Sequence, residues 1–212
     1  GQGRDLDRAL ADGNSVSVVT ADSDEGLHTL RHSTAHVLAQ AVLDLWPGAT
    51  HAIGPPIEDG FYYDFELPEG GAFTVDDLEA IDARMREIIA ADQAFERFEA
   101  GSSEALELFA EHRYKREIIE KVTTGAADVE MAREASTDGT VTWYRNGEGF
   151  VDLCTGPHVP STGRLGHFAL QKVAGAYWRG DEKQPMLQRI YGTAWADKKS
   201  LKSHLHRLAE AE

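Results

Sequence analysis

The chain has 212 residues, 42% of them hydrophobic, and a formal net charge of −15. This size is enough for one large globular domain or two small lobes with a hydrophobic core. No apolar run approaches the roughly 20 residues that a membrane span needs, and the first fifteen residues are polar, so we expect neither a membrane span nor a secretory signal.

The acidic charge is unevenly distributed along the chain. Residues 164–207 hold nine Lys or Arg against three Asp or Glu, a local balance of +6, so the remainder carries −21. A uniformly acidic protein would repel nucleic acid, whereas this asymmetry permits a basic surface on an acidic body. Charge alone leaves a nucleic-acid surface and an ordinary solvated face equally open.

The first third of the chain predicts a strand, a helix and an extended segment. Residues 16–20 alternate apolar and polar side chains, which predicts a short strand. Apolar residues at helical spacing predict a helix from about residue 26 to 45, capped by Asp24 and ended by Trp46-Pro47-Gly48. Residues 50–67 are expected to be extended with a turn.

The middle of the chain is predicted to be mainly helical. Thr74 followed by Asp77 is a capping signal for a helix to about residue 91. Phe95 and Phe98 alternate around charges, which indicates a strand. Ser102 or Ser103 is expected to cap a helix through residue 112, followed by a further helical run to about 122. The polar segment 123–139 is expected to be a loop with a short helical piece.

The last third predicts hairpins and a final helix. An Asn146-Gly147 turn joins two β-rich segments into a hairpin that ends at Cys154. Two further β-rich segments, 167–178 and 186–195, precede a helix from about residue 196. Helices and hairpins alternate without a βαβ pattern, so we predict an α+β fold with mostly antiparallel sheets packed with helices.

Two pairs of residues could carry chemistry. His32 and His36 lie four apart on the first predicted helix, so both imidazoles share a face. Cys154 and His158 repeat the interval across Gly156-Pro157, which excludes a helix there. Together they match either a zinc ligand set or a group of general acid–base residues, and spacing does not decide between these. A single cysteine fits a reducing cytoplasm.

Other candidates surround these pairs. Asp152 lies two residues before Cys154, on the same side of a strand, and could orient a histidine or bind an ammonium group. Lys115 follows Tyr114 and lies among the like charges Arg113 and Arg116, and from sequence alone a solvated helix face is the better interpretation. Of the adjacent Tyr62 and Tyr63, one is expected to face the core and the other a cleft.

Four longer segments carry a resemblance to a known family. RHSTAHVLAQAV, IGPPIEDGFYYDF, FVDLCTGPHVP and AGAYWRGDEKQPMLQRIYGTAWADKK resemble, in the same order, the editing region of bacterial threonyl-tRNA synthetase. The resemblance runs from about residue 22 to the end of the chain. A related domain with the same paired elements occurs in alanyl-tRNA synthetase and in free-standing relatives, but GFYYDF and QRIYGTAWADKK favour the threonyl version.

This resemblance implies a proofreading function. The family attaches threonine to tRNA, and serine lacks only one methyl group, which a pocket can reject by only ~1–3 kcal/mol. A second site therefore hydrolyses seryl-tRNA(Thr), and we expect this chain to be that aminoacyl-tRNA deacylase, without aminoacylation activity. The alternatives are a zinc-stabilised RNA-binding or structural module without catalysis, and a free-standing deacylase.

The resemblance also implies the site residues. His32, His36, Cys154 and His158 match the family's site, and Asp152, Lys115 and Tyr63 match positions in or near the pocket; Tyr63 and the backbone near Gly54 are expected to reject threonine. We expect His32 to orient or deprotonate a water, His36 and His158 to hold the terminal adenosine or leaving hydroxyl, Asp152 to bind the substrate ammonium and Lys115 to stabilise the oxyanion.

The same resemblance implies cofactors, partners and domains. No cofactor is expected to be required for editing, although zinc at the four His and Cys residues is an alternative; ATP and the family's well-established zinc belong to the missing catalytic domain. Residues 1–21 are expected to be a remnant of the small N-terminal domain, 22–195 the editing domain and 196–212 the start of a linker helix, so the chain is expected to be an excised piece. Its expected partners are the acceptor end of tRNA(Thr) charged with serine and the remaining domains of a homodimeric, cytoplasmic synthetase.

Overall fold

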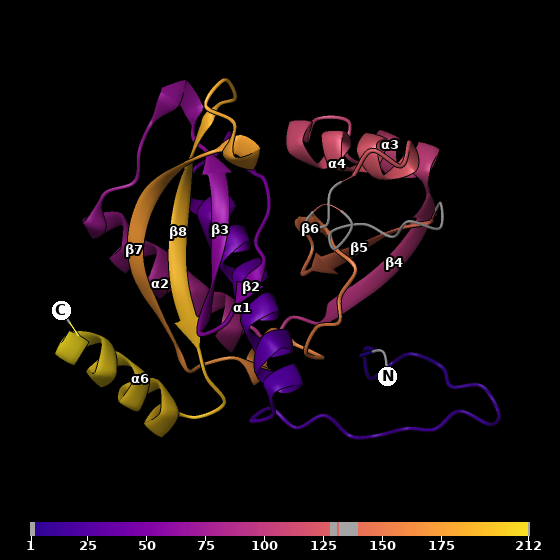
Figure 1. Ribbon diagram of the computed structural model, residues 1–212, viewed down its shortest axis with the longest axis horizontal. Coiled ribbons are helices and arrows are strands. Elements are labelled where there is room, and N and C mark those ends of the chain that lie inside the picture. The colour runs from indigo at the N-terminus through magenta and orange to yellow at the C-terminus, as the bar shows by residue number, and fades with distance from the viewer. Residues whose placement is uncertain (1–2, 128–130, 132–139, 212) are drawn as a thin grey trace.

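The computed structural model describes residues 3–127, 131 and 140–211, and shows an α+β fold built on two antiparallel sheets (Figure 1). The predicted fold class is therefore confirmed. The larger sheet has the strand order β1-β3-β8-β7, with β2 paired to β3, and the smaller sheet has the order β4-β5-β6. The segment expected to be a loop with a helical piece falls mostly on residues 128–130 and 132–139, outside the described part.

The larger sheet is covered on one face by two helices. Phe61, Tyr63, Phe65 and Ile190 alternate along β3 and β8 and form one hydrophobic core with both helices. The residues between them on each strand point to the opposite face of the sheet, away from this core. The elements of this half are α1 Asp24–Leu45, β1 Thr50–His51, β2 Pro56–Ile57, β3 Gly60–Glu66, α2 Val75–Ala90, β7 Phe168–Tyr177 and β8 Met186–Ala194.

The smaller sheet carries two short helices, which Figure 1 shows above it. Ala100, Val141 and Leu153 belong to a second core with these helices, while Phe95, Tyr144 and Phe150 face α1 in the first core. The smaller sheet therefore contributes one face to each core. Its elements are β4 Phe95–Gly101, α3 Ser102–Leu108, α4 Arg113–Thr123, β5 Thr140–Asn146 and β6 Phe150–Leu153.

The chain ends in helix α6 (Lys198–Ala211), which Figure 1 shows beside the ends of β7 and β8. Short 3-10 helices cover Pro68–Gly70, Thr162–Arg164 and Trp178–Gly180. Within the described part of the chain, no helix combines the length and the apolar character that crossing a membrane requires.

Several local predictions were wrong. Residues 16–20 form no strand and pair with no strand of the described chain; Val16 and Val18 are 63% and 88% exposed. The cap of α1 is Ser23, whose side chain accepts from the Gly26 amide, and not Asp24, which lies in the first turn. The helix predicted through residue 112 ends at Leu108, and Gly101 precedes it without a side-chain cap.

Other local predictions were confirmed. Thr74 and Asp77 form a reciprocal capping box at the start of α2. The hairpin of β5 and β6 exists, but Asn146 belongs to β5 and pairs with Phe150, so its connection has three residues and not two.

Candidate active site

Two elements bring His32, His36, Cys154 and His158 together; we call these four residues the quartet. The histidines of α1 lie one helical turn apart, and the thiol and His158 come from the loop after β6. The Sγ atom of Cys154 lies 3.2 Å from His32 Nε2 and 3.3 Å from His158 Nε2. All four side chains are buried. The two pairs singled out in the sequence thus form one cluster.

The loop that carries the thiol depends on a glycine. Gly156 has φ +71°, and a Cβ atom there would lie 2.0 Å from the hydroxyl of Tyr144. Its amide donates to Cys154 Sγ at 3.1 Å. The break that Gly156-Pro157 predicts therefore folds the loop back, so that Cys154 and His158 face each other.

His158 is held by a residue that the sequence did not single out. Ser33, next to His32 on α1, lies with its hydroxyl 3.0 Å from His158 Nδ1 and accepts from the Val159 amide at 3.1 Å. The ring of Phe95 stacks on the imidazole with centroids 4.7 Å apart. This contact leaves Nε2 of His158 to face the thiol. Apart from its position beside His32, no sequence signal marks Ser33.

A buried ion pair lies behind the quartet. Lys115 Nζ of α4 lies 2.5 Å from Asp152 Oδ1, and the two side chains are 0% and 1% exposed. Tyr63 donates its hydroxyl hydrogen to Asp152 Oδ2 at 2.5 Å and accepts from Lys115 at 3.2 Å. The interpretation of Lys115 as part of a solvated helix face was wrong, because the lysine turns inward to pair with a carboxylate from the smaller sheet.

Two histidines flank this carboxylate. His36 Nε2 lies 3.4 Å from Asp152 Oδ2, and His51 Nε2 lies 3.4 Å from Asp152 Oδ1. His51, on β1, is buried and was not among the predicted site residues. A single histidine in an extended segment gives no spacing signal, so only the folded chain reveals its place beside Asp152.

Burial sets the charge state of these groups. Burial lowers the pKa of His36 to about 4 and holds the pKa of His32 and of His158 well below 6.5. The pKa of Asp152 is well below its ordinary value: burial would raise it, but Lys115 and then His36 lower it more. Near neutral pH the site therefore holds neutral imidazoles beside an ionised carboxylate paired with a lysine.

Gly54 and Tyr63, expected in the substrate pocket, lie against each other. A Cβ atom on Gly54 would lie 2.0 Å from the ring of Tyr63, so only glycine lets the backbone approach it. Tyr63 faces inward towards Asp152, whereas Tyr62 packs under the guanidinium of Arg189, 3.7 Å from its ring centroid. One tyrosine of the pair is thus directed at the site and the other away from it.

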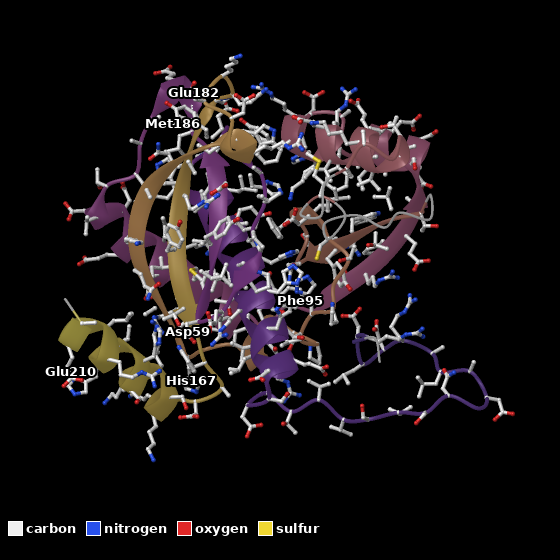
Figure 2. The ribbon with its side chains drawn as sticks, viewed as in Figure 1. Asp59, Phe95, His167, Glu182, Met186 and Glu210 are labelled. Atoms are coloured by element: carbon white, nitrogen blue, oxygen red, sulfur yellow. The ribbon has the colours of Figure 1, made fainter. Side chains whose placement is uncertain are left out.

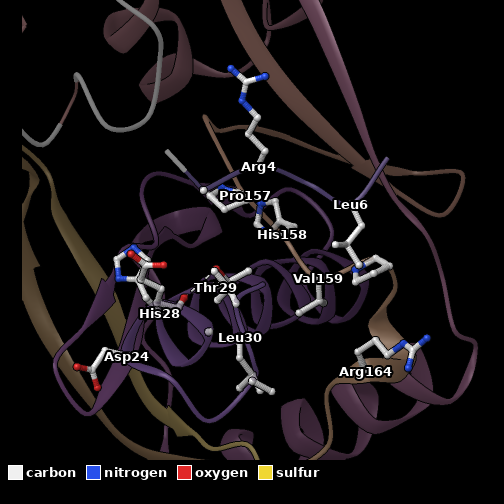
Figure 3. Close-up of a pocket in the computed structure, with 16 residues that line it drawn as sticks. Arg4, Leu6, Asp24, His28, Thr29, Leu30, Pro157, His158, Val159 and Arg164 are labelled. Atoms are coloured by element: carbon white, nitrogen blue, oxygen red, sulfur yellow. Dashed lines mark hydrogen bonds between the residues drawn. The ribbon is translucent and has the colours of Figure 1, made fainter. Parts of the chain in front are cut away.

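A cavity of about 830 Å³ opens beside His158 (Figure 3). It lies between the first turns of α1, the loop of Pro157 and Val159, and the N-terminal segment around Arg4 and Leu6. The quartet is thus bordered by open space on the side of His158.

The quartet has the donors of a metal site. Its four ligand atoms all lie within 4.8 Å of one another. Three imidazoles and a thiolate are a zinc set, for which a tetrahedral site requires N–S separations of about 3.5 Å; the two close separations are 3.2 and 3.3 Å. His36 Nδ1 is buried without a hydrogen-bond partner in the described chain, while the other ring nitrogen of His36, Nε2, faces the Asp152 carboxylate. These residues fit a zinc ion.

Comparison with known proteins points to one class, the aminoacyl-tRNA synthetases. Residues 141–191 match the family described as the threonyl and alanyl tRNA synthetase second additional domain. The chain is also similar over nearly all its length to threonine--tRNA ligases of three bacteria. It is 51% identical to that of Rubrobacter xylanophilus over 98% of the chain, 53% to that of Maricaulis maris over 100%, and 50% to that of Acidithiobacillus ferrooxidans over 99%.

The chain is therefore similar to one part of the threonine--tRNA ligases, the part that includes this additional domain, which supports the predicted resemblance to an editing-domain fragment. It spans 30–31% of the length of these relatives. The activities, substrates and partners of the complete enzymes are therefore proposals for this chain.

Proposed function

We propose that this chain hydrolyses the ester bond of serine wrongly attached to tRNA(Thr). The observation that carries the proposal is the quartet itself, in which neutral histidines surround a thiol beside the Asp152–Lys115 pair. Such a buried set of acid–base groups supports proton transfer at a carbonyl. The similarity of the chain to threonine--tRNA ligases makes an aminoacyl ester the substrate that fits best.

In the proposed reaction, a water attacks the ester carbonyl, the bond to the ribose oxygen breaks, and serine and the tRNA hydroxyl leave. A histidine with a strongly lowered pKa is a weak base, so His32 is assigned to orient this water and to take up its proton only as the carbon–oxygen bond forms. His36 and His158 are assigned to the ribose and the leaving hydroxyl.

We assign electrostatic roles in the reaction to the side chains of Asp152 and Lys115. The Asp152 carboxylate already forms an ion pair with Lys115 and accepts a hydrogen bond from the Tyr63 hydroxyl. Its first proposed role is therefore to hold the side chains of His36 and Lys115 in position. Binding of the substrate ammonium by Asp152 stays a prediction, as does stabilisation of the developing oxyanion by Lys115.

A zinc ion held by His32, His36, Cys154 and His158 would polarise a carbonyl or lower the pKa of a bound water. With all four ligands closed around the ion, it would instead stabilise the fold. The second candidate function, a zinc-stabilised RNA-binding or structural module, rests on this fit.

The test is deacylation of seryl-tRNA(Thr) and threonyl-tRNA(Thr) by chelator-treated chain, with the metal content of chain never exposed to chelator measured in parallel. Faster loss of serine than of threonine supports the proposal. Stoichiometric zinc with four protein ligands and no deacylation would favour the structural module.

Selection against threonine is proposed to lie at the contact of Gly54 with Tyr63. The glycine backbone and the tyrosine ring are already in van der Waals contact, so this wall cannot retreat to admit an extra methyl group. Action within a complete, cytoplasmic synthetase, as a homodimer, is part of the same proposal.

A further inference from the structure

The face of the larger sheet that points away from α1 and α2 carries a row of aromatic and basic side chains. Because side chains alternate along a strand, Tyr62, Arg189 and Tyr191 point opposite to core residues Phe61 and Ile190. Lys172 on β7 is directly opposite Tyr191 in the register, and Tyr191 is directly opposite Tyr62. The row therefore crosses three strands.

These side chains support one another by stacking. Lys172 Nζ lies 5.0 Å from the ring centroid of Tyr191, and the Arg189 guanidinium lies 3.7 Å from that of Tyr62. Asp64 fixes the guanidinium through hydrogen bonds of 2.7 and 2.8 Å. The cations are thus held in place by rigid neighbours, with Lys172 exposed.

Helix α6 adds a second group of basic side chains beside the ends of β7 and β8. Its exposed residues include Lys198, Lys199, Lys202 and Arg207, against Glu210 as the single acid within its bounds. Figure 2 marks His167 and Asp59 where α6 approaches the sheet, and Met186 and Glu182 at the opposite end of the β7–β8 hairpin. The segment with a balance of +6 thus supplies strands β7 and β8 and the helix.

We propose that the outward face of β3, β8 and β7, together with α6, binds the phosphate backbone of the RNA that carries the ester. We call it the basic sheet face, defined by Lys172, Arg189, Tyr191, Lys198 and Lys202. This proposal rests on the proposed function for its choice of RNA. Charge complementarity carries it: the basic residues gather here on a chain of net charge −15, and polyphosphate is the partner that such a surface attracts.

The basic sheet face is a docking surface and takes no part in the chemistry. α1, which carries His32 and His36, packs against the opposite side of the same sheet, so sheet and helix separate the row of cations from the quartet. Loss of cations here is therefore expected to raise KM for the charged RNA.

The test is the affinity of the full chain for uncharged tRNA(Thr) at several KCl concentrations, for the wild type and the double variant Lys172→Gln, Lys202→Gln. The logarithm of the association constant falls linearly with log salt, and each lost phosphate contact makes this fall less steep by about 0.9, or about 0.7 for a single strand. For the double variant we therefore expect a slope shallower than that of the wild type by about 1.5 to 2. The matched control, Arg84→Gln with Arg86→Gln on α2, removes the same charge from the covered side of the sheet and should keep the wild-type slope.

The possible results separate this proposal from the proposed function. Equal slopes for the wild type and both double variants would overturn the basic sheet face as an RNA surface. So would a slope that falls equally in both double variants, or self-association of the chain that only Lys172→Gln, Lys202→Gln abolishes. Salt-dependent tRNA binding lost in that variant, with no seryl-tRNA hydrolysis by the wild type, would uphold the surface and overturn the deacylase.

Discussion

His32 is the residue on which the proposed chemistry depends most. Its Nε2 atom faces the thiol of Cys154 at 3.2 Å, and its ring is buried among His36 and His158. We expect His32→Ala to slow deacylation of seryl-tRNA by about 10²- to 10⁴-fold, the usual contribution of a general acid–base group. Cys154→Ala should retain activity within about tenfold, since a water attack needs no covalent step.

Single-turnover deacylation rates measure both effects. His167→Ala is the matched control, because this half-exposed histidine lies outside the site. Loss of activity in Cys154→Ala with full activity in His32→Ala would show that the thiol is the nucleophile.

The histidines also predict how stability depends on pH. A histidine whose pKa falls on folding favours the folded chain while it is neutral, so this stability is complete above about pH 6.5 and is lost as the pH falls towards 4. His36, with a folded pKa of about 4, accounts for on the order of 3 kcal/mol of that loss. Asp152, whose pKa lies below 3.8, adds a separate loss at still lower pH.

Urea unfolding at intervals from pH 7 to pH 4, with chelator present, measures this dependence. His36→Gln should flatten the decline, whereas replacing the exposed His206 by Gln should leave it unchanged. A free energy of unfolding that stays constant between pH 6.5 and 4 would contradict the lowered pKa values.

At the scale of elements, a buried ion pair joins α4 to the smaller sheet, in addition to the hydrophobic core that the two share. Lys115 is buried with Asp152 as its partner, so Lys115→Met leaves an unpaired buried carboxylate and should cost about 3–5 kcal/mol. Lys121→Met on the same helix removes a half-exposed pair with Glu117 and should cost less than about 1 kcal/mol. Urea unfolding compares the two; equal losses would mean that the Lys115 pair does not hold α4.

Elements with a strong local signal could be predicted from the sequence. The helix of His32 and His36, the capping box of Thr74 and the paired strands β7 and β8 follow from periodicity and turn residues. Residues 16–20 alternate like a strand but lack a partner, and a strand forms only with one.

The candidate site was predictable only in part, because tertiary contacts assemble it. Lys115 has charged neighbours in sequence, and its burial results from Asp152 on another element. His51 and Ser33 belong to no recurring spacing, yet they contact Asp152 and His158. That the two i,i+4 pairs form one site came from the resemblance of long segments, since spacing alone is compatible with two separate sites.

At the scale of the whole molecule, the two sheets have different proposed functions. The smaller sheet and α1 enclose the quartet, and the outward side of the larger sheet carries the cations of the basic sheet face. This arrangement separates RNA docking from ester hydrolysis, so variants of one are expected to leave the other measurable.

The most direct measurement of the central claim is the single-turnover hydrolysis of seryl-tRNA(Thr) and threonyl-tRNA(Thr) by the chelator-treated chain. We expect the serine ester to be hydrolysed faster by about 10-fold or more, because one excluded methyl group corresponds to ~1–3 kcal/mol. Equal rates for the two esters, or no hydrolysis of either above the uncatalysed rate, would contradict the account.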